Sequence, residues 1–217
     1  MQFHKLIVHF ASLAMVCLIA VPAEGQIASR PVEEWIKTLD GPQRVADMKI
    51  GELVAALKLQ PGQTVADIGA GTGLLVVPLA NAVGARGRVY AVEIDAGFFP
   101  QIRKRVDAAG VKNVDTVLGK FTDPALPVRT IDVALFHDVI HHVQERASYI
   151  KTLAGYLAPT GRMVVIDYEP ARSPHSQQPE LQVSREQLIA WMKDAGLTQI
   201  EDVKLFTDKY FLAFAKR

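Results

Sequence analysis

The sequence predicts an α/β protein with a mostly parallel sheet that is covered by helices on both faces. From residue 61 onwards, strand-like and helix-like segments alternate, which is typical of parallel strands joined by crossover helices. A glycine-rich turn, Gly69–Gly73, follows the first strand-like segment and opens into a helix. With 49% hydrophobic residues, the 217-residue chain can bury the core of one domain. We therefore expect one folded α/β domain over residues 61–217.

The first 25 residues predict a signal peptide or a membrane anchor. Lys5 provides a positive start, and the run from Leu6 to Ala23 is almost wholly apolar. Small residues near Ala23 and Gly25 suit cleavage by signal peptidase. The apolar run is also close to the length that spans a bilayer, so an anchor over residues 6–23 is the alternative. We expect a periplasmic or secreted protein after cleavage.

Charge and cysteine content exclude several classes of protein. Lys and Arg number 24 against 23 Asp and Glu, with no basic cluster, so we expect no nucleic-acid partner. The only cysteine, Cys17, lies in the apolar N-terminal run. A cleaved chain therefore has neither a disulfide framework nor a thiolate metal site. Membrane contact is expected only through an uncleaved N-terminal segment, and the sequence leaves the oligomeric state open.

Residues 26–60 predict two helices ahead of the sheet. Apolar residues repeat at helical spacing around Trp35 and again from Met48 to Leu57. The helix breakers Asp40-Gly41-Pro42 separate the two groups, and Pro61-Gly62 follows the second. This segment is expected to be helical and to precede the first strand.

Five strands with intervening helices are predicted next. The strands are Thr64–Ile68, Arg88–Val92, Asp115–Leu118, Asp132–Phe136 and Arg162–Ile166. The helices are Leu74–Val83, Phe99–Ala109, Ile140–Val143 with its continuation, and Arg146–Leu157. After a further helix at Arg185–Ala195, the β-rich runs Gln199–Leu205 and Tyr210–Ala215 end the pattern. The short connection between these runs leaves no room for a crossover helix, so this pair should be antiparallel.

The sharpest functional signal is the strand that ends in the glycine-rich turn. Val65–Gly73 reads V-A-D-I-G-A-G-T-G, and its glycines let the main chain approach a ligand closely. The next strand ends in Glu93, 20 residues beyond Gly73. A carboxylate there can accept hydrogen bonds from both ribose hydroxyls of an adenosyl group. Dinucleotide sites favour G-x-G-x-x-G over this G-x-G-x-G, so a nicotinamide-dependent oxidoreductase is the weaker alternative.

These segments resemble the motifs of class I S-adenosylmethionine-dependent methyltransferases. Val65–Gly73 is similar to the first motif and Val89–Asp95 to the second. Three further segments match in order: Asn113–Lys120, Ile131–His137 and Leu157–Arg162. The resemblance runs from residue 61 to the end of the chain. It implies a Rossmann-like seven-stranded sheet with an antiparallel C-terminal pair, and a transferase with S-adenosyl-L-methionine as cofactor.

The resemblance also implies the cofactor contacts. The glycine turn would contact the methionyl part, Glu93 the ribose, and Ile94 the adenine face. The family often has an acidic residue where this chain has Lys120, which cannot accept from the adenine amino group. Asp123 or the backbone would then replace it. The cofactor-binding residues implied are Asp67 (directly or through water), Gly69, Ala70, Gly71, Gly73, Glu93, Ile94, Lys120, Phe121 and Phe136.

Histidines follow the fourth predicted strand. His137 and His141 lie four residues apart, a spacing that places them on one face of a helix. We expect His141, with His137 as the alternative, to remove a proton from the acceptor or to orient it, because imidazole titrates near neutral pH. An equal alternative is that they only shape the pocket wall. The sequence places no further ligand to complete a coordination sphere, so no metal site is expected.

The functional hypothesis is methyl transfer by in-line displacement to a small-molecule acceptor, since the chain carries no appended recognition module. A non-catalytic domain that binds an adenosyl ligand is the alternative in another class. The candidate substrate or lid residues are Trp35, Arg44, Lys49 and Trp191. The proline-rich segment Tyr168–Gln182, which contains His175, is a candidate substrate-side loop. Packing or solvent exposure explains these features equally well.

Overall fold

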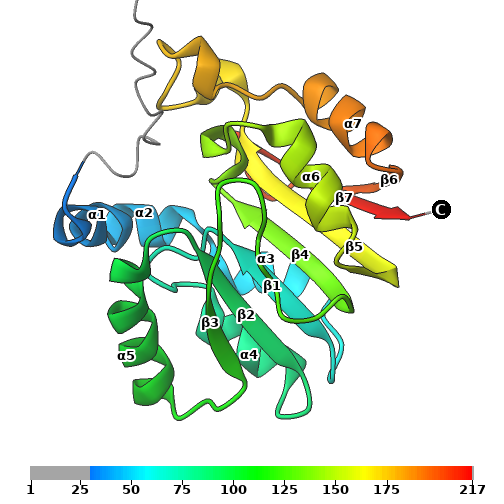
Figure 1. The fold of residues 1–217 in the computed structure, drawn as a ribbon. Helices are drawn as coiled ribbons and strands as arrows, with labels where there is room; N and C mark the ends of the chain where they lie inside the picture. Colours follow the sequence, from blue (N-terminus) through cyan, green and yellow to red (C-terminus); the bar gives the residue numbers. More distant parts are fainter. Residues whose placement is uncertain (1–29, 217) are drawn as a thin grey trace, which may run out of the picture.

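The structure, a computed structural model, describes residues 30–216. They form a seven-stranded sheet in the order β3-β2-β1-β4-β5-β7-β6 (Figure 1). Strands β1 to β5 are parallel, and β7 pairs antiparallel with both β5 and β6. The predicted parallel sheet and antiparallel C-terminal pair are therefore confirmed. The strand order reverses between β1 and β4, and ligands of such sheets bind at this switch point, beyond the carboxyl ends of the strands.

Each predicted strand is present, with ends that differ by a few residues. Strand β5 is much longer than expected, because it begins at the turn before Arg162 and bulges against β4: Ile131 pairs with Leu157, but Val133 pairs with Arg162. The strands are β1 Thr64–Ile68, β2 Arg88–Glu93, β3 Val114–Leu118, β4 Ile131–His137, β5 Leu157–Tyr168, β6 Leu197–Asp202 and β7 Lys209–Lys216.

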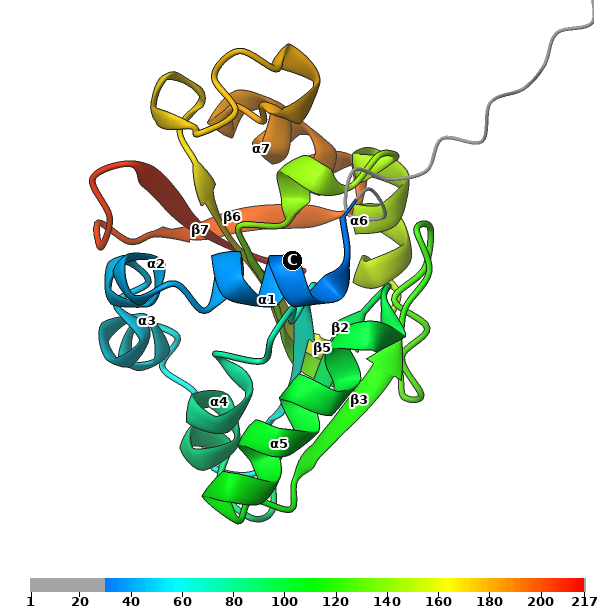
Figure 2. The same ribbon diagram turned by 90° about the vertical axis from the view of Figure 1, so that its left-hand side faces the viewer.

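Helices cover both faces of the sheet (Figures 1 and 2). Alternate strand residues point to opposite faces, so Val65 and Leu135 pack with α3 and α4, whereas Ala66 and Phe136 pack with α6 and α7. Helix α5 packs beside α4 and β3. The helices are α1 Val32–Leu39, α2 Pro42–Asp47, α3 Ile50–Ala56, α4 Val76–Val83, α5 Phe99–Ala109, α6 Arg146–Ala154 and α7 Arg185–Asp194.

The N-terminal segment forms three helices where the sequence predicts two. The predicted break at Asp40-Gly41-Pro42 is present, but a second break separates α2 from α3 at Lys49, whose φ of 46° is left-handed. Met48, beside this break, is almost fully buried against the core. The break lets the chain turn so that Leu53 of α3 packs under the sheet, which periodicity alone does not reveal.

Two further expectations are wrong in detail. Ile140–His142 forms one 3₁₀ turn, η3, and does not continue as a helix into α6. Helix α4 begins at Val76, because the preceding glycine turn extends further than expected. No helix among residues 30–216 is both long and apolar enough to cross a membrane. The predicted export or anchor segment, residues 1–25, lies outside the described part of the chain, as does Cys17.

Candidate functional site

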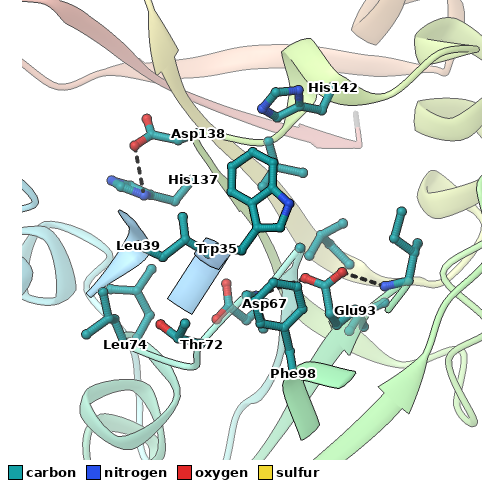
Figure 3. A pocket seen from close by; sticks show the side chains of 18 of the residues that line it. Trp35, Leu39, Asp67, Thr72, Leu74, Glu93, Phe98, His137, Asp138 and His142 are labelled. Carbon is teal, nitrogen blue, oxygen red and sulfur yellow. Dashed lines mark hydrogen bonds and ion pairs between the residues drawn. The ribbon is translucent and has the colours of Figure 1, made fainter. Parts of the chain in front are cut away.

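A pocket lies at the carboxyl ends of the central strands. Ile68 at the end of β1 pairs with Val92 of β2 on one side and with Phe136 of β4 on the other. The residues that follow, Gly69, Glu93 and His137, therefore come to the same edge of the sheet. All three line the pocket, with part of α1 and the loop after β3 (Figure 3).

The glycine turn closes one side of this pocket. Gly69 has a φ of +70°, and a Cβ atom there would lie 2.6 Å from Val139 Cγ2, so both the backbone and the close contact require glycine. Gly69, Ala70 and Gly71 line the pocket, as expected. Gly73 does not: it faces α5, and a Cβ atom there would lie 3.1 Å from Ile102. A cofactor contact of Gly73 stays a prediction, since in this turn Gly73 lies against α5 and does not line the pocket.

Two buried carboxylates face this turn. Glu93 accepts hydrogen bonds from the backbone N–H groups of Gly71 (2.9 Å) and Ile94 (2.7 Å). Burial nevertheless raises the pKa of Glu93 above its usual value, against the opposing effect of these N–H groups. Asp67 also lines the pocket, and its burial, with repulsion from Glu93, raises its pKa to about 7. This end of the pocket therefore favours a ligand with hydroxyl donors and positive charge.

Helix α1 covers the pocket and is tied to the glycine turn. Asp40, at the end of α1, accepts hydrogen bonds from Thr72 Oγ1 (2.6 Å) and from Arg105 (2.6 Å), and Arg105 also donates to the Thr72 carbonyl (2.9 Å). Figure 2 shows α1 crossing in front of the central strands. Trp35 and Leu39 of this helix line the pocket (Figure 3). Arg44 of α2 also lines it. Two of the four candidate lid residues, Trp35 and Arg44, thus lie at the site. Lys49 and Trp191 do not line the pocket: Lys49 donates to the Leu205 carbonyl, and Trp191 packs against the core.

The residues implied for the adenine also line the pocket. Ile94, Lys120 and Phe121 border it, the last with about half of its surface exposed (51%). Asp123, the suggested substitute acceptor, is engaged elsewhere, because its Oδ1 accepts from Tyr156 Oη (2.8 Å) and from the backbone of Ala125 (2.7 Å). It does not line the pocket. The backbone alternative is therefore the one compatible with this arrangement.

His137 and Asp138 form the opposite wall. Burial lowers the pKa of His137 to about 4, so its imidazole is neutral at pH 7. Its Nδ1 faces Asp138 Oδ2 at 3.6 Å, and its buried Nε2 has no hydrogen-bond partner among the described residues. Asp138 accepts from Lys209 Nζ (2.8 Å) and lies 3.7 Å from Arg44. Burial opposes ionisation of Asp138, but these cationic neighbours and His137 lower its pKa overall.

The predicted pairing of His137 and His141 on one helical face is wrong. His137 ends a strand, and His141 lies in the 3₁₀ turn with its Nδ1 bonded to Asp167 at 2.7 Å. His141 is buried and does not line the pocket, whereas its neighbour His142 does. Burial, followed by the charge of His141, lowers the pKa of His142 to about 3. His141 touches His142 and, across the loop after β5, His175.

Phe136 also lies away from the predicted contact. It is fully buried on the α6 face, with its ring 6.2 Å from that of Tyr149 in an edge-to-face arrangement, and it does not line the pocket. Because side chains alternate along a strand, it is the following residue, His137, that reaches the pocket. Sequence reasoning did not select Thr72, Asp138 or His142. Asp138 and His142 adjoin predicted site residues, and position after the fourth strand was the available signal.

Comparison with known proteins agrees with this geometry. Residues 66–165 match a family model described as a methyltransferase domain. An aklanonic acid methyltransferase of Streptomyces sp. (strain C5) is 31% identical over 74 residues, covering 34% of this chain and 34% of that protein. A protein-L-isoaspartate O-methyltransferase of Aeropyrum pernix is 33% identical over 119 residues, covering 54% of this chain and 43% of that protein. The chain thus matches less than half the length of these curated relatives.

A crystal structure supports the same fold. A SAM-dependent methyltransferase from Aquifex aeolicus has a TM-score of 0.76 and 23% sequence identity, covering 85% of this chain and 98% of that chain. Residues 66–165 therefore match a methyltransferase-domain model, and the fold is similar to that of a SAM-dependent methyltransferase of known structure.

Proposed function

We propose that this chain transfers the methyl group of S-adenosylmethionine to a small-molecule acceptor. The observation that carries the proposal is the placement of Asp67, Glu93 and the glycine turn around one pocket at the switch point of the sheet. A cationic adenosyl ligand matches these groups, since its ribose hydroxyls and positive charge meet buried carboxylates. Helix α1 covers the same pocket, which favours a small, enclosed ligand.

The residues present fit the cofactor. Glu93 offers a buried carboxylate to the ribose hydroxyls, and the glycine turn lines the pocket with Gly69, Ala70 and Gly71. Trp35 and Phe98 supply apolar surface in the same pocket. When bound, S-adenosylmethionine supplies a methyl group that is activated by its sulfonium. The chain's own part is to hold and align the reactants. Alignment of this kind can lower the barrier by about 7–11 kcal/mol in well-oriented systems.

His137 is the residue we assign to the acceptor. With its Nδ1 proton directed to Asp138, its Nε2 lone pair is free to accept the proton of an acceptor hydroxyl or amine. Lys209 and Arg44 favour the ionised form of Asp138, whose negative charge favours the tautomer with the proton on Nδ1. The neutral state of His137 at pH 7 keeps the lone pair available, although its lowered pKa makes it a weak base. Positioning of the acceptor is therefore its main contribution.

Calorimetry followed by a product assay tests the proposal. Full-length protein is titrated with S-adenosylmethionine, S-adenosylhomocysteine and NAD, and then incubated with small-molecule acceptor libraries while S-adenosylhomocysteine release is measured. Binding of both adenosyl ligands but not NAD, with acceptor-dependent release, is the expected result. Binding without release for every acceptor class favours the non-catalytic alternative, and binding of NAD alone favours an oxidoreductase.

We also propose that residues 1–25 direct export, because Lys5 precedes the apolar run from Leu6 to Ala23. A cleaved, periplasmic or secreted chain is the expected product, with an anchor over residues 6–23 as the alternative. Cell fractionation with N-terminal sequencing distinguishes the two. A soluble cytosolic chain that begins at Met1 contradicts both.

A further inference from the structure

Three histidines from two separate segments meet beside the pocket. One nitrogen of each of His141, His142 and His175 lies within 4.8 Å of the others. The ring centroids are 4.1 Å apart for His141 and His142, and 5.3 Å and 5.5 Å for the two pairs with His175. Sequence spacing places no third ligand beside His141, but the loop after β5 brings His175 back over η3.

Each outer histidine has one ring nitrogen already oriented by an acceptor. His141 Nδ1 lies 2.7 Å and 2.9 Å from the two carboxylate oxygens of Asp167, which is itself 2% exposed. His175 Nδ1 lies 2.8 Å from Gln178 Oε1. In both rings Nδ1–H then donates, which leaves the Nε2 lone pair free. Metal-binding histidines characteristically have this outer partner, a carboxylate or amide oxygen that fixes the tautomer and makes the ring a better ligand.

The third histidine has an unmet requirement. His142 Nδ1 is buried, and no residue in the described part of the chain forms a hydrogen bond with it. A buried nitrogen without a partner costs free energy. His142 also lines the methyl-transfer pocket, so the cluster reaches the pocket wall.

The loop that carries His175 is held to η3 by directed hydrogen bonds. Arg146 donates to the carbonyl of His141 (2.6 Å) and to that of Glu180 (2.6 Å), which links the two segments. Within the loop, Gln182 donates to the His175 carbonyl (3.1 Å), and the buried Ser173 accepts from the His175 backbone N–H (3.0 Å). The meeting of the histidines thus follows from an ordered loop.

We propose that His141, His142 and His175 bind a divalent transition-metal ion such as Zn²⁺. Three imidazoles suit this class of ion, and three protein ligands leave a fourth position open. In a tetrahedral site with bonds of about 2.0–2.1 Å the ligand nitrogens lie about 3.4 Å apart, so the rings need to close by about 1–1.5 Å at most. Asp167 supplies a nearby negative charge, while the opposing charge of Arg146 is engaged by backbone carbonyls.

The ion would serve the acceptor end of the pocket, a role that rests on the proposed methyl transfer. Because His142 lines the pocket, an acceptor oxygen that reaches this wall can take the open coordination position. The substrate class that this favours is a small molecule with a hydroxyl or enol group, whose pKa a bound ion lowers. Metal binding itself does not depend on this role and can be measured without any acceptor.

The test uses tag-free, full-length protein stripped with a chelator. Zn²⁺ is titrated calorimetrically, and Co²⁺ is followed by its visible absorption, which reports tetrahedral nitrogen coordination. We expect one ion per chain, and His175→Gln should weaken binding by at least about 100-fold, beyond the 10- to 100-fold effect expected of Asp167→Asn as an outer partner. His137→Gln is the matched control, because it removes a nearby histidine that is not in the cluster, and it should leave the metal affinity unchanged.

Equal metal affinity in wild type and folded His175→Gln protein, or no binding by folded wild type, overturns the proposal. Folding is checked by circular dichroism, and S-adenosylmethionine binding is measured on the stripped protein. Cofactor binding without metal binding contradicts the metal site and leaves the proposed function standing. Metal binding without cofactor binding contradicts the proposed function and leaves the metal site standing.

Discussion

The two ends of the pocket are built in different ways. The cofactor end uses residues at the ends of two adjacent strands. The turn after β1 and Glu93 at the end of β2 are joined by a hydrogen bond from Gly71 N–H. The histidine end collects side chains from β4, η3, β5 and the loop after β5, separated by up to about 40 residues. One end depends on backbone conformation, and the other on how distant side chains pack.

This difference predicts different consequences for substitutions. Changes at the cofactor end should alter the affinity for S-adenosylmethionine and leave the chemistry of the bound complex largely intact. Changes at the histidine end should alter turnover and leave cofactor affinity nearly unchanged. Five variants examine this division, in order of decreasing expected effect, with His141→Gln placed beside the first as its companion.

His137→Gln should lower turnover by about 100-fold at saturating cofactor, because His137 mainly positions the acceptor and a displacement of about 1 Å can cost that much. Cofactor affinity should stay within a few-fold of wild type. Steady-state kinetics with an identified acceptor measure the first quantity and calorimetry the second. Because burial lowers the pKa of His137 to about 4, its protonation should not reduce turnover until the pH approaches that value.

His141→Gln is the companion variant for the histidine end. His141 does not line the pocket, so it can affect the acceptor only through its contact with His142 or through the proposed metal ion. The cofactor affinity of the His141→Gln variant should also match that of wild type. Turnover within a few-fold of wild type for both variants, across neutral pH, shows that the histidines only form the wall and that alignment carries the reaction.

Glu93→Ala should weaken S-adenosylmethionine binding by one to two orders of magnitude, because charge-assisted hydrogen bonds contribute about 1.5–3 kcal/mol. Calorimetry measures the change, and thermal unfolding confirms that the variant is folded. Glu93→Gln is the conservative comparison, since it keeps the shape and one acceptor oxygen, and it should lose less. A folded Glu93→Ala protein with wild-type affinity contradicts the assignment of the ribose site.

Gly69→Ala should destabilise the fold by about 1–3 kcal/mol, through the left-handed backbone and the contact with Val139. Denaturant unfolding measures the loss. Val139→Ala in the same chain should recover part of it, because only the steric contribution is removed. An equal loss of unfolding free energy with and without Val139→Ala contradicts a steric contact between residue 69 and Val139.

Asp67→Asn should change the pH dependence of cofactor binding. With a pKa of about 7, wild-type Asp67 gains its charge as the pH rises from 6 to 8, so affinity for the cationic cofactor should rise several-fold over that range. The variant lacks this step. The melting temperature of the variant should also exceed that of wild type by more at pH 8 than at pH 5. Between the unfolded and folded pKa values of Asp67, the folded wild type holds a proton that the unfolded chain has lost. The wild type therefore loses stability as the pH rises through these two pKa values, and the variant does not.

The sequence by itself determined the sheet and the cofactor end of the pocket. Alternating strand and helix periods, turn residues and the spacing from Gly73 to Glu93 are local properties, and each fixes a local conformation. Parallel strands then bring the end of β1 level with that of β2, so Glu93 meets the glycine turn without further information. The observed ends of single strands and helices differ from the predicted ends by a few residues, because capping and bulges depend on packing.

Only the tertiary structure decided the histidine end. The spacing of His137 and His141 suggests a shared helical face, but the chain leaves β4 through Asp138, whose φ is +57°, and forms a single 3₁₀ turn. That turn directs His142 into the pocket and His141 towards Asp167, and the ordered loop after β5 brings in His175. Contacts between residues 26 to 34 positions apart arise from packing and long-range hydrogen bonds, which leave no periodic signal in the sequence.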